Sequence, residues 1–223
     1  MASSDHTARF AARSGRGARL ARWRFRLTAW AVVLAAFALS IRYDRLLSAW
    51  GQEHLRVLPN HVLVSLRDFG QITPVIAATV ALACYDRRRR ALVGAMVVAT
   101  SLAGAAQGLG KLVIHRYRPS AAQVADLAAD DWRALWVGVS WHKEPMALES
   151  FPSGHTCLAF AFAGILSGFY PRARWVFWAL AFGCGFSRYI DHVHWISDCI
   201  AGGAIGYAAA WLTLQPMRRR GTI

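Results

Sequence analysis

The sequence has few cysteines and few acidic residues. Its four cysteines are far apart and fall in or beside apolar stretches, at Cys84, Cys157, Cys184 and Cys199. Cysteine metal sites use closely spaced pairs, so this spacing argues against such a site and indicates packing roles. No internal repeat or low-complexity linker interrupts the chain, so we expect a single helical domain.

The shortage of acidic residues leaves the chain strongly basic. Asp and Glu number 12 against 26 Lys and Arg, a formal net charge of +14, while 56% of the 223 residues are hydrophobic. A basic chain can bind nucleic acid through a soluble face with interleaved aromatics. Here the basic residues cluster between apolar segments instead. We therefore expect a lipid bilayer as partner and no nucleic acid.

Long apolar runs predict an all-α, polytopic membrane protein with six transmembrane helices. Several runs have only about 15 residues against the roughly 20 that a bilayer core needs, so flanking residues must contribute. The first run resembles a secretory signal, but its long basic leader favours an anchor. The six runs are Leu27–Ile41, Gln71–Tyr85, Ala91–Ile114, Thr156–Tyr170, Trp175–Ile190 and Trp195–Leu214.

Arginine clusters predict the orientation. With six spans, all four clusters share one side: the leader from Arg9 to Arg26, Arg87–Arg90, Arg172 with Arg174, and Arg218–Arg220. The positive-inside rule makes that side cytoplasmic, with both termini there, in a bacterial-type inner membrane. We divide the chain into a basic leader (1–26), disordered or on the lipid surface, a membrane domain (27–214) and a basic tail (215–223).

Three connections then lie on the outer side: 42–70, 116–151 and 191–194. Within the first, Arg45–Leu58 alternates apolar and polar residues and predicts an interfacial helix. The second carries acidic residues and tryptophans suited to a membrane interface, and we expect it to help form a lipid entrance. Those residues are Asp126, Asp130, Asp131, Glu144, Glu149, Trp132, Trp136 and Trp141.

Unexpected polar residues occur at the outer ends of these runs. In "KLVIHRYRP", Lys111 and Arg118 are seven residues apart, which is two helical turns. We expect them to project from one side of a helix that ends at Pro119. An alternative is that both side chains only snorkel to the membrane surface.

The sequence "PSGH" begins the fourth run with a pattern suited to an anion. Pro152 fits the first turn of a helix, Gly154 lets a ligand approach the backbone, and free N–H groups at a helix start attract phosphate. Ser153 can donate a hydroxyl hydrogen bond, and His155 can protonate a leaving oxygen. A capped helix start alone would explain most of this tetrapeptide.

A third polar segment, "SRYIDHVHWISD", leads into the sixth run. His194 and Asp198 have the i, i+4 spacing that brings side chains together on one helix face. A carboxylate so placed can orient an imidazole as a nucleophile, and Arg188 supplies a planar fork for phosphate oxygens. His192 and His115 lack such a partner, and we interpret them as interfacial or supporting residues.

These three segments resemble the signature motifs of the type 2 phosphatidic acid phosphatase superfamily. Lys111–Pro119 matches K-x6-R-P, Pro152–His155 matches P-S-G-H, and Ser187–Asp198 matches S-R-x5-H-x3-D, in order and without a substitution. The resemblance implies a helical bundle shared with soluble vanadium haloperoxidases and acid phosphatases. The six-run plan is similar to the membrane branch of that family.

The resemblance also implies a mechanism. His194, oriented by Asp198, would attack phosphorus to form a phosphohistidine, while His155 protonates the leaving oxygen and then activates water. The phosphoryl oxygens would be held by Lys111, Arg118, Ser153, Arg188 and the Gly154 N–H. No metal and no cofactor is implied, because cationic groups stand where a metal-dependent phosphatase would supply carboxylates.

We therefore expect an enzyme that removes phosphate from an amphiphilic phosphate or diphosphate at the outer leaflet. Candidate substrates are phosphatidic acid, phosphatidylglycerol phosphate, isoprenoid diphosphates and lipid A phosphates. One alternative is phosphate transfer between lipids, since an acceptor other than water can resolve a phosphoenzyme; haloperoxidase activity is a weaker one. An anion transporter is disfavoured, because the polar groups collect at one end of the apolar runs.

Overall fold

The structure is a computed structural model that describes the chain except residues 1–2, 56–57, 86–89, 125–130, 140–145 and 222. Several residues singled out above lie outside the described residues: Arg87, Arg88, Arg89, Asp126, Asp130, Trp141 and Glu144. The chain forms two compact units, Met1–Leu39 and Ser40–Ile223, which we describe separately.

The first unit consists of most of helix α1, which spans Ser3–His54 and continues into the second unit. No proline occurs before Pro59, so nothing in the sequence breaks the helix. The leader is helical from Ser3, and whether it lies on a lipid surface stays a prediction. The expected separate interfacial helix at Arg45–Leu58 is wrong, because this stretch continues α1 as far as His54.

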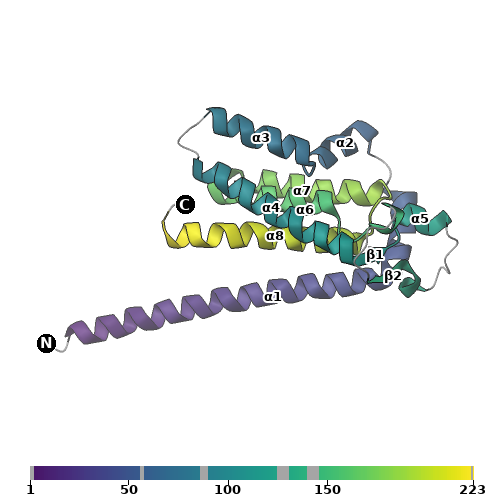
Figure 1. The fold of residues 1–223 in the computed structure, drawn as a ribbon. Helices are drawn as coiled ribbons and strands as arrows, with labels where there is room; N and C mark the ends of the chain where they lie inside the picture. The colour runs from purple at the N-terminus through teal and green to yellow at the C-terminus, as the bar shows by residue number, and fades with distance from the viewer. Residues whose placement is uncertain (1–2, 56–57, 86–89, 125–130, 140–145, 222) are drawn as a thin grey trace. The chain divides into compact units, whose positions relative to one another are not determined.

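The second unit is a helical bundle. Its helices are α2 (Asn60–Asp68), α3 (Ile72–Tyr85), α4 (Arg90–Val113), α6 (Gly154–Phe169), α7 (Arg174–Ile190) and α8 (Ile196–Arg219). Helices α4, α6, α7 and α8 lie side by side (Figure 1). The bounds of α3, α4, α6 and α7 agree with the apolar runs to within two residues, and α8 begins one residue late and extends five further.

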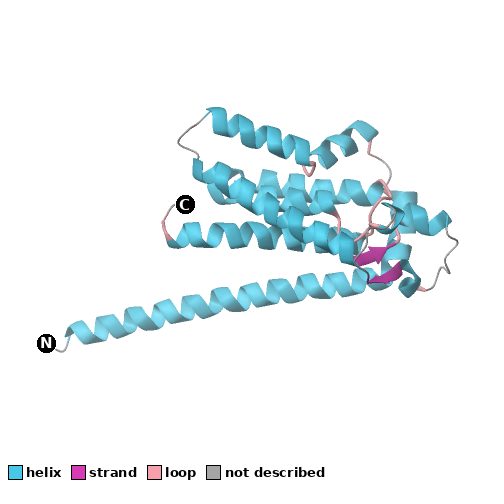
Figure 2. Ribbon diagram, viewed as in Figure 1, coloured by secondary structure: helices cyan, strands magenta, loops and turns pink. Residues whose placement is uncertain are grey.

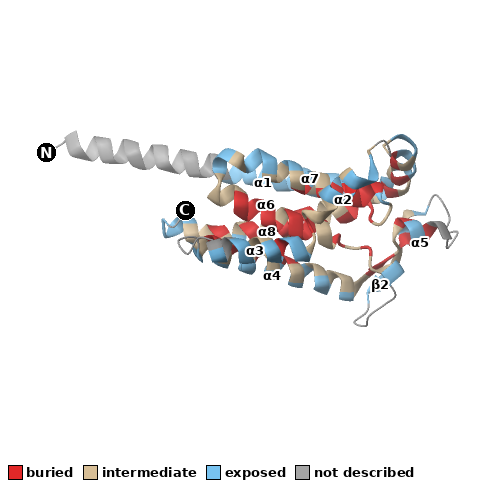
Figure 3. Cartoon of the chain, turned by 90° about the horizontal axis from the view of Figure 1, so that it is seen from above, coloured by how far each residue is buried: buried red, intermediate tan, exposed pale blue. Residues whose placement is uncertain are grey.

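Helix α6 is the centre of this bundle. Its residues from Thr156 to Leu166 are buried almost without interruption (Figure 3). Glycines on α8 allow a close approach, since a Cβ added at Gly206 would lie 2.1 Å from the Cys157 carbonyl oxygen. At the start of both helices, the Ser153 N–H donates to the Asp198 carbonyl oxygen at 3.1 Å. This packing holds the "PSGH" segment against the segment that contains His194 and Asp198.

The described chain is mostly helical, as expected, but one end of the bundle departs from an all-α fold. Strands β1 (Ile114–Arg116) and β2 (Trp136–Val139) form a two-stranded antiparallel sheet there (Figure 2). Ile114 pairs with Val139, and β-branched and aromatic residues favour such pairing. Short elements complete the unit: α5 (Pro119–Val124) and the 3-10 turns Trp132–Leu135, Met146–Leu148 and Pro171–Ala173.

This sheet changes the relation between Lys111 and Arg118. Helix α4 ends at Val113, so only Lys111 lies on it, whereas Arg118 follows β1. The predicted shared helix face is therefore wrong. Pro119 also begins α5 rather than ending a helix, as its preset φ and missing donor allow at a first helical position.

Within the part of the chain that the structure describes, two helical stretches are long and apolar enough to cross a membrane, Trp23–His54 and Arg90–Val113. Ile72–Ala81 and Gly154–Phe169 are apolar but shorter. Large apolar side chains are exposed on the outer faces of α4 and α7, at Val97, Val98, Leu102, Leu109, Trp175, Val176 and Phe182. Such faces suit lipid contact, and six transmembrane helices remain a prediction.

Candidate active site

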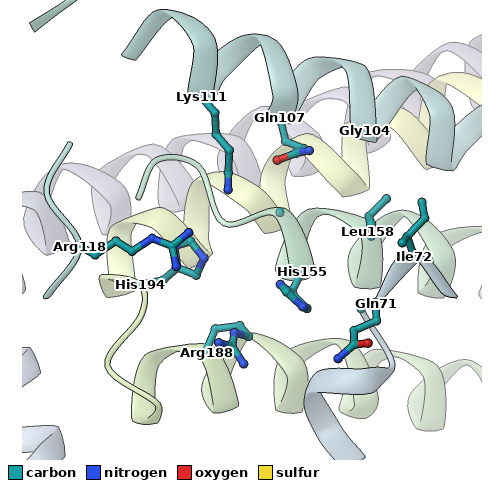
Figure 4. Close-up of a pocket in the computed structure, with 12 residues that line it drawn as sticks. Gln71, Ile72, Gly104, Gln107, Lys111, Arg118, His155, Leu158, Arg188 and His194 are labelled. Atoms are coloured by element: carbon teal, nitrogen blue, oxygen red, sulfur yellow. The ribbon is translucent and has the colours of Figure 1, made fainter. Parts of the chain in front are cut away.

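One cavity of about 480 Å³ brings the three motif segments together (Figure 4). Six of the eight predicted site residues line it: Lys111, Arg118, Gly154, His155, Arg188 and His194. Ser153 and Asp198 are not in the lining and lie buried behind it. The sequence segments therefore converge in space, as their positions at the ends of the apolar runs predicted.

Cationic side chains dominate the charge of this cavity. Lys111 comes from the last turn of α4, Arg118 from the segment after β1, and Arg188 from the last turn of α7. Arg188 Nη1 also contacts Asp191 Oδ2 at 2.9 Å. No carboxylate belongs to the described residues that line the cavity. The arrangement creates a positive environment suited to an anion.

His194 has one ring nitrogen engaged and one available. Its Nδ1 lies 2.8 Å from the Ser150 carbonyl oxygen, which can only accept a hydrogen bond. Nδ1 therefore carries the proton, and the lone pair is on Nε2. Burial lowers the pKa of His194 below its ordinary value, although the neighbouring Asp198 opposes this shift. A neutral imidazole with a free nitrogen has the properties of a nucleophile.

The expected placement of His194 and Asp198 on one helix face is wrong. His194 precedes α8, which begins at Ile196, while Asp198 lies in its first turn. His194 Nδ1 is 3.7 Å from Asp198 Oδ2, which is longer than its contact with Ser150. The side chains of His194 and Asp198 are still close together, because the chain turns sharply into α8 at Trp195.

Asp198 has several fixed donors. It is fully buried, and its Oδ2 accepts hydrogen bonds from Ser150 Oγ at 2.5 Å and from the Trp195 N–H at 3.0 Å. The second bond caps the start of α8. By holding Ser150, Asp198 also helps to fix the carbonyl oxygen that binds His194. Its orienting effect on His194 therefore passes partly through Ser150.

Asp44, Arg116 and Asp198 form a buried cluster of ion pairs that the sequence analysis did not predict. We call these three residues the buried ion-pair network. Arg116 has a fully buried side chain, with Nη2 at 2.6 Å from Asp44 Oδ2 and Nη1 bound to Asp198 Oδ1. The guanidinium lies 4.4 Å from the ring centroid of Trp136 and 5.6 Å from that of Trp195. A buried arginine is thus neutralised by two carboxylates and covered by two aromatic rings.

Ser197 completes this network. Its N–H donates to Asp44 Oδ1 at 3.1 Å, its hydroxyl donates to Asp44 Oδ2, and Arg116 Nη1 lies 2.6 Å from the same hydroxyl. Asp44 thereby ties the part of α1 that belongs to the second unit to the start of α8. One signal in the sequence could have found it, because Asp44 is an isolated acidic residue three positions after the apolar run that ends at Ile41.

The "PSGH" segment is used differently from the expectation. Pro152 precedes the helix rather than occupying its first turn, and packs beside α4, where a Cβ added at Gly110 would lie 2.7 Å from Pro152 Cδ. Ser153 Oγ contacts Thr156 Oγ1 at 2.9 Å. Gly154 admits a neighbouring side chain, since a Cβ there would lie 2.9 Å from Gln107 Oε1.

The two other histidines of the motif segments lie apart from the cavity lining. His192 Nδ1 is 3.1 Å from Ser48 Oγ, and His115 is buried in β1. Neither belongs to the described residues that line the cavity.

Comparison with known proteins identifies relatives of this chain. The model of the PAP2 superfamily matches residues 92–221. Lipid A 1-phosphatase of Rhizobium johnstonii is 43% identical over 68 residues, which cover 30% of this chain and 27% of that protein. Bacitracin transport permease protein BcrC of Bacillus licheniformis is 38% identical over 61 residues, 27% of this chain and 30% of that protein. The chain thus spans less than a third of these curated relatives.

Two solved structures share the fold over most of their length. LpxE of Aquifex aeolicus has a TM-score of 0.53 at 23% identity, covering 82% of this chain and 94% of that one. A transmembrane PAP2-type phosphatidylglycerolphosphate phosphatase of Bacillus subtilis has a TM-score of 0.60 at 18% identity, covering 85% of this chain and 96% of that one.

Proposed function

Because this chain belongs to the PAP2 superfamily, we propose that it is a metal-independent membrane phosphatase acting on a lipid phosphate or diphosphate through a phosphohistidine intermediate. One observation carries the proposal. His194, with Nδ1 bound to the Ser150 carbonyl oxygen, lies at the wall of a cavity that Lys111, Arg118 and Arg188 also line. A nucleophile and an anion site are thus together.

In the first step, the Nε2 lone pair of His194 attacks phosphorus. The bond between phosphorus and the leaving oxygen breaks, and its electron pair goes to that oxygen, which takes a proton from His155. The three cationic side chains neutralise the charge on the phosphoryl oxygens, and the Gly154 N–H at the start of α6 adds a donor. Ser153 contributes to this site through its position directly before α6.

In the second step, a water molecule attacks the phosphohistidine. His155, now neutral, accepts a proton from that water, the bond between phosphorus and Nε2 breaks, and its electrons return to the imidazole. Phosphate then leaves the cationic cavity. Neither step needs a metal ion, because cationic side chains stand where metal-dependent phosphatases present carboxylates.

The relatives suggest substrate classes for this chemistry. Lipid A 1-phosphatase and phosphatidylglycerolphosphate phosphatase are named for phosphorylated lipids. For this chain we propose an amphiphilic phosphate of that kind, reached from the outer leaflet of a bacterial inner membrane. The described arginines Arg172, Arg174, Arg218 and Arg219 support this orientation, since they lie at the ends of α6, α7 and α8 that are opposite to the cavity-lining residues.

The mechanism is tested by trapping the intermediate. Purified enzyme is mixed with a labelled substrate, quenched rapidly, and examined for acid-labile, base-stable label on the protein. We expect His194→Ala to lose both label and turnover. His155→Ala should still accept label from a substrate with a good leaving group, because little protonation is needed, but should release it slowly. Full turnover by His194→Ala would show the mechanism to be wrong.

Orientation is tested by thiol labelling in a background where the exposed Cys84 is replaced by Ser. In intact spheroplasts, an impermeant thiol reagent should modify Met146→Cys, at an exposed position beside β1. It should not modify Arg172→Cys, which lies between α6 and α7. The reverse pattern would invert the topology.

Two additions test the metal-independent chemistry. A chelator should not reduce activity, and vanadate should inhibit it as a mimic of pentacoordinate phosphorus.

A further inference from the structure

The cavity has two chemically different ends (Figure 4). Arg118, Arg188 and His194 lie toward one end, which we call the cationic end. Gln71, Ile72 and Leu158 lie at the other, the neutral end, where none of the described lining residues is Lys or Arg. His155 and Gln107 lie between them. A substrate filling the cavity would therefore place its phosphate at one end and a different group at the other.

The proposed reaction decides which part of the substrate enters the neutral end, so this inference rests on the proposed function. Displacement at phosphorus places the attacking and leaving atoms roughly in line. With Nε2 of His194 on one side, the leaving oxygen points away from it, toward His155, which protonates it. The alcohol that carries the leaving oxygen then extends past His155 into the neutral end.

Gln107 is placed to contact that alcohol. It lies on α4 one turn before Lys111, and its amide crosses the start of α6 at Gly154. Its Oε1 is buried and has no hydrogen-bond partner among the described residues. Gln71 differs, because its Nε2 already donates to Asp68 Oδ1 at 2.7 Å. A buried carbonyl oxygen without a donor is unfavourable, so a ligand that supplies one gains affinity.

We propose that Gln107 forms a leaving-group subsite that accepts a hydrogen bond from a hydroxyl or amide N–H beside the scissile ester oxygen. The substrate class is a phosphate monoester of an amphiphilic polyol or amino sugar. A prenyl diphosphate fits less well. Its leaving group presents anionic oxygens, which only accept hydrogen bonds and cannot supply the donor that Gln107 Oε1 lacks.

The test uses two amphiphiles that differ by one hydroxyl. A 1-O-alkyl-glycerol 3-phosphate has a free hydroxyl beside the ester carbon, and its 2-deoxy analogue lacks it. For the full chain in detergent micelles, we expect kcat/KM to favour the hydroxyl-bearing ester by roughly tenfold. Gln107→Met keeps the side-chain size and removes the acceptor, so the ratio should fall to about one. Gln71→Met, the matched control, should retain the preference.

The wild-type ratio requires no variant, so poor folding of Gln107→Met cannot hide the result. Equal kcat/KM for both esters in the wild type would overturn the subsite, as would a preference for a prenyl diphosphate over both. A preference that persists in Gln107→Met would assign the contact to another residue and equally overturn it. Absence of phosphate release from every substrate would instead reject the proposed function.

Discussion

Two arginines separated by one residue have opposite surroundings. Arg116 has a fully buried side chain held between Asp44 and Asp198, whereas Arg118 lines the cavity and forms no ion pair with residues that the structure describes. One cation is neutralised internally and the other faces the cavity. Alternation along a strand would place residues two apart on the same side, so what separates the two arginines of "HRYRP" is the end of β1 at Arg116, with Arg118 beyond it.

The largest expected effect comes from removing the structural arginine. Arg116→Met leaves two carboxylates buried without their cation, which costs about 3–5 kcal/mol of unfolding free energy. The thermal unfolding temperature should fall by roughly 10 °C, with loss of activity. Arg116→Lys keeps the charge but cannot bridge both carboxylates with a planar fork, so its stability should be intermediate. An unchanged unfolding temperature in Arg116→Met would refute the structural role.

Removing the cavity-lining arginine, Arg118, should affect catalysis instead. Arg118→Met should lower kcat/KM by roughly 10²–10³-fold, because one preorganised cation facing the phosphoryl oxygens is lost. Its unfolding temperature should stay within about 2 °C of the wild type, since no ion pair with the described residues is broken. Steady-state kinetics and thermal unfolding on the same preparation check both. Comparable stability losses in Arg116→Met and Arg118→Met would erase the distinction between them.

A smaller loss of stability is expected when Asp44, the second carboxylate that anchors Arg116 in the buried ion-pair network, is changed. Asp44→Asn removes one carboxylate from Arg116 but leaves its contact with Asp198, so we expect a loss of about 1–3 kcal/mol. The control is Asp68→Asn, because Asp68 is 42% exposed and pairs with Arg67 at 3.2 Å, where an ion pair contributes little. Chemical denaturation should separate the two variants, and equal stability would show that Asp44 is not an anchor.

The smallest expected effect is a shift in pH dependence. Burial lowers the pKa of His194, so the acidic limb of kcat/KM should lie below pH ~6.5, the ordinary histidine value. The positive charge of Arg118 contributes to this lowering. Its removal in Arg118→Met raises the pKa of His194, so the limb should move to higher pH. Movement of the limb to lower pH would contradict the assignment of that limb to His194.

Local sequence predicted the helices well. Apolar runs, their lengths and the flanking prolines are local features, so the predicted bounds of α3, α4, α6 and α7 lie within two residues of those in the structure. Local sequence patterns did not predict the structure where segments distant in the sequence pair with one another. The pairing of β1 with β2 depends on residues twenty or more positions apart, and it removed Arg118 from the helix that the Lys111 spacing had predicted.

The candidate site shows the same contrast between what local sequence predicts and what only the tertiary structure decides. The motif segments predicted eight site residues, of which six line the cavity, because each segment lies at the end of an apolar run on the same side of the bundle. Only the tertiary structure decided how they are held. Arg116 meets Asp44 and Asp198 across 72 and 82 positions, and His194 meets Ser150 across 44. No periodicity links residues so far apart, since burial brings a charge to its partner only when the whole bundle has formed.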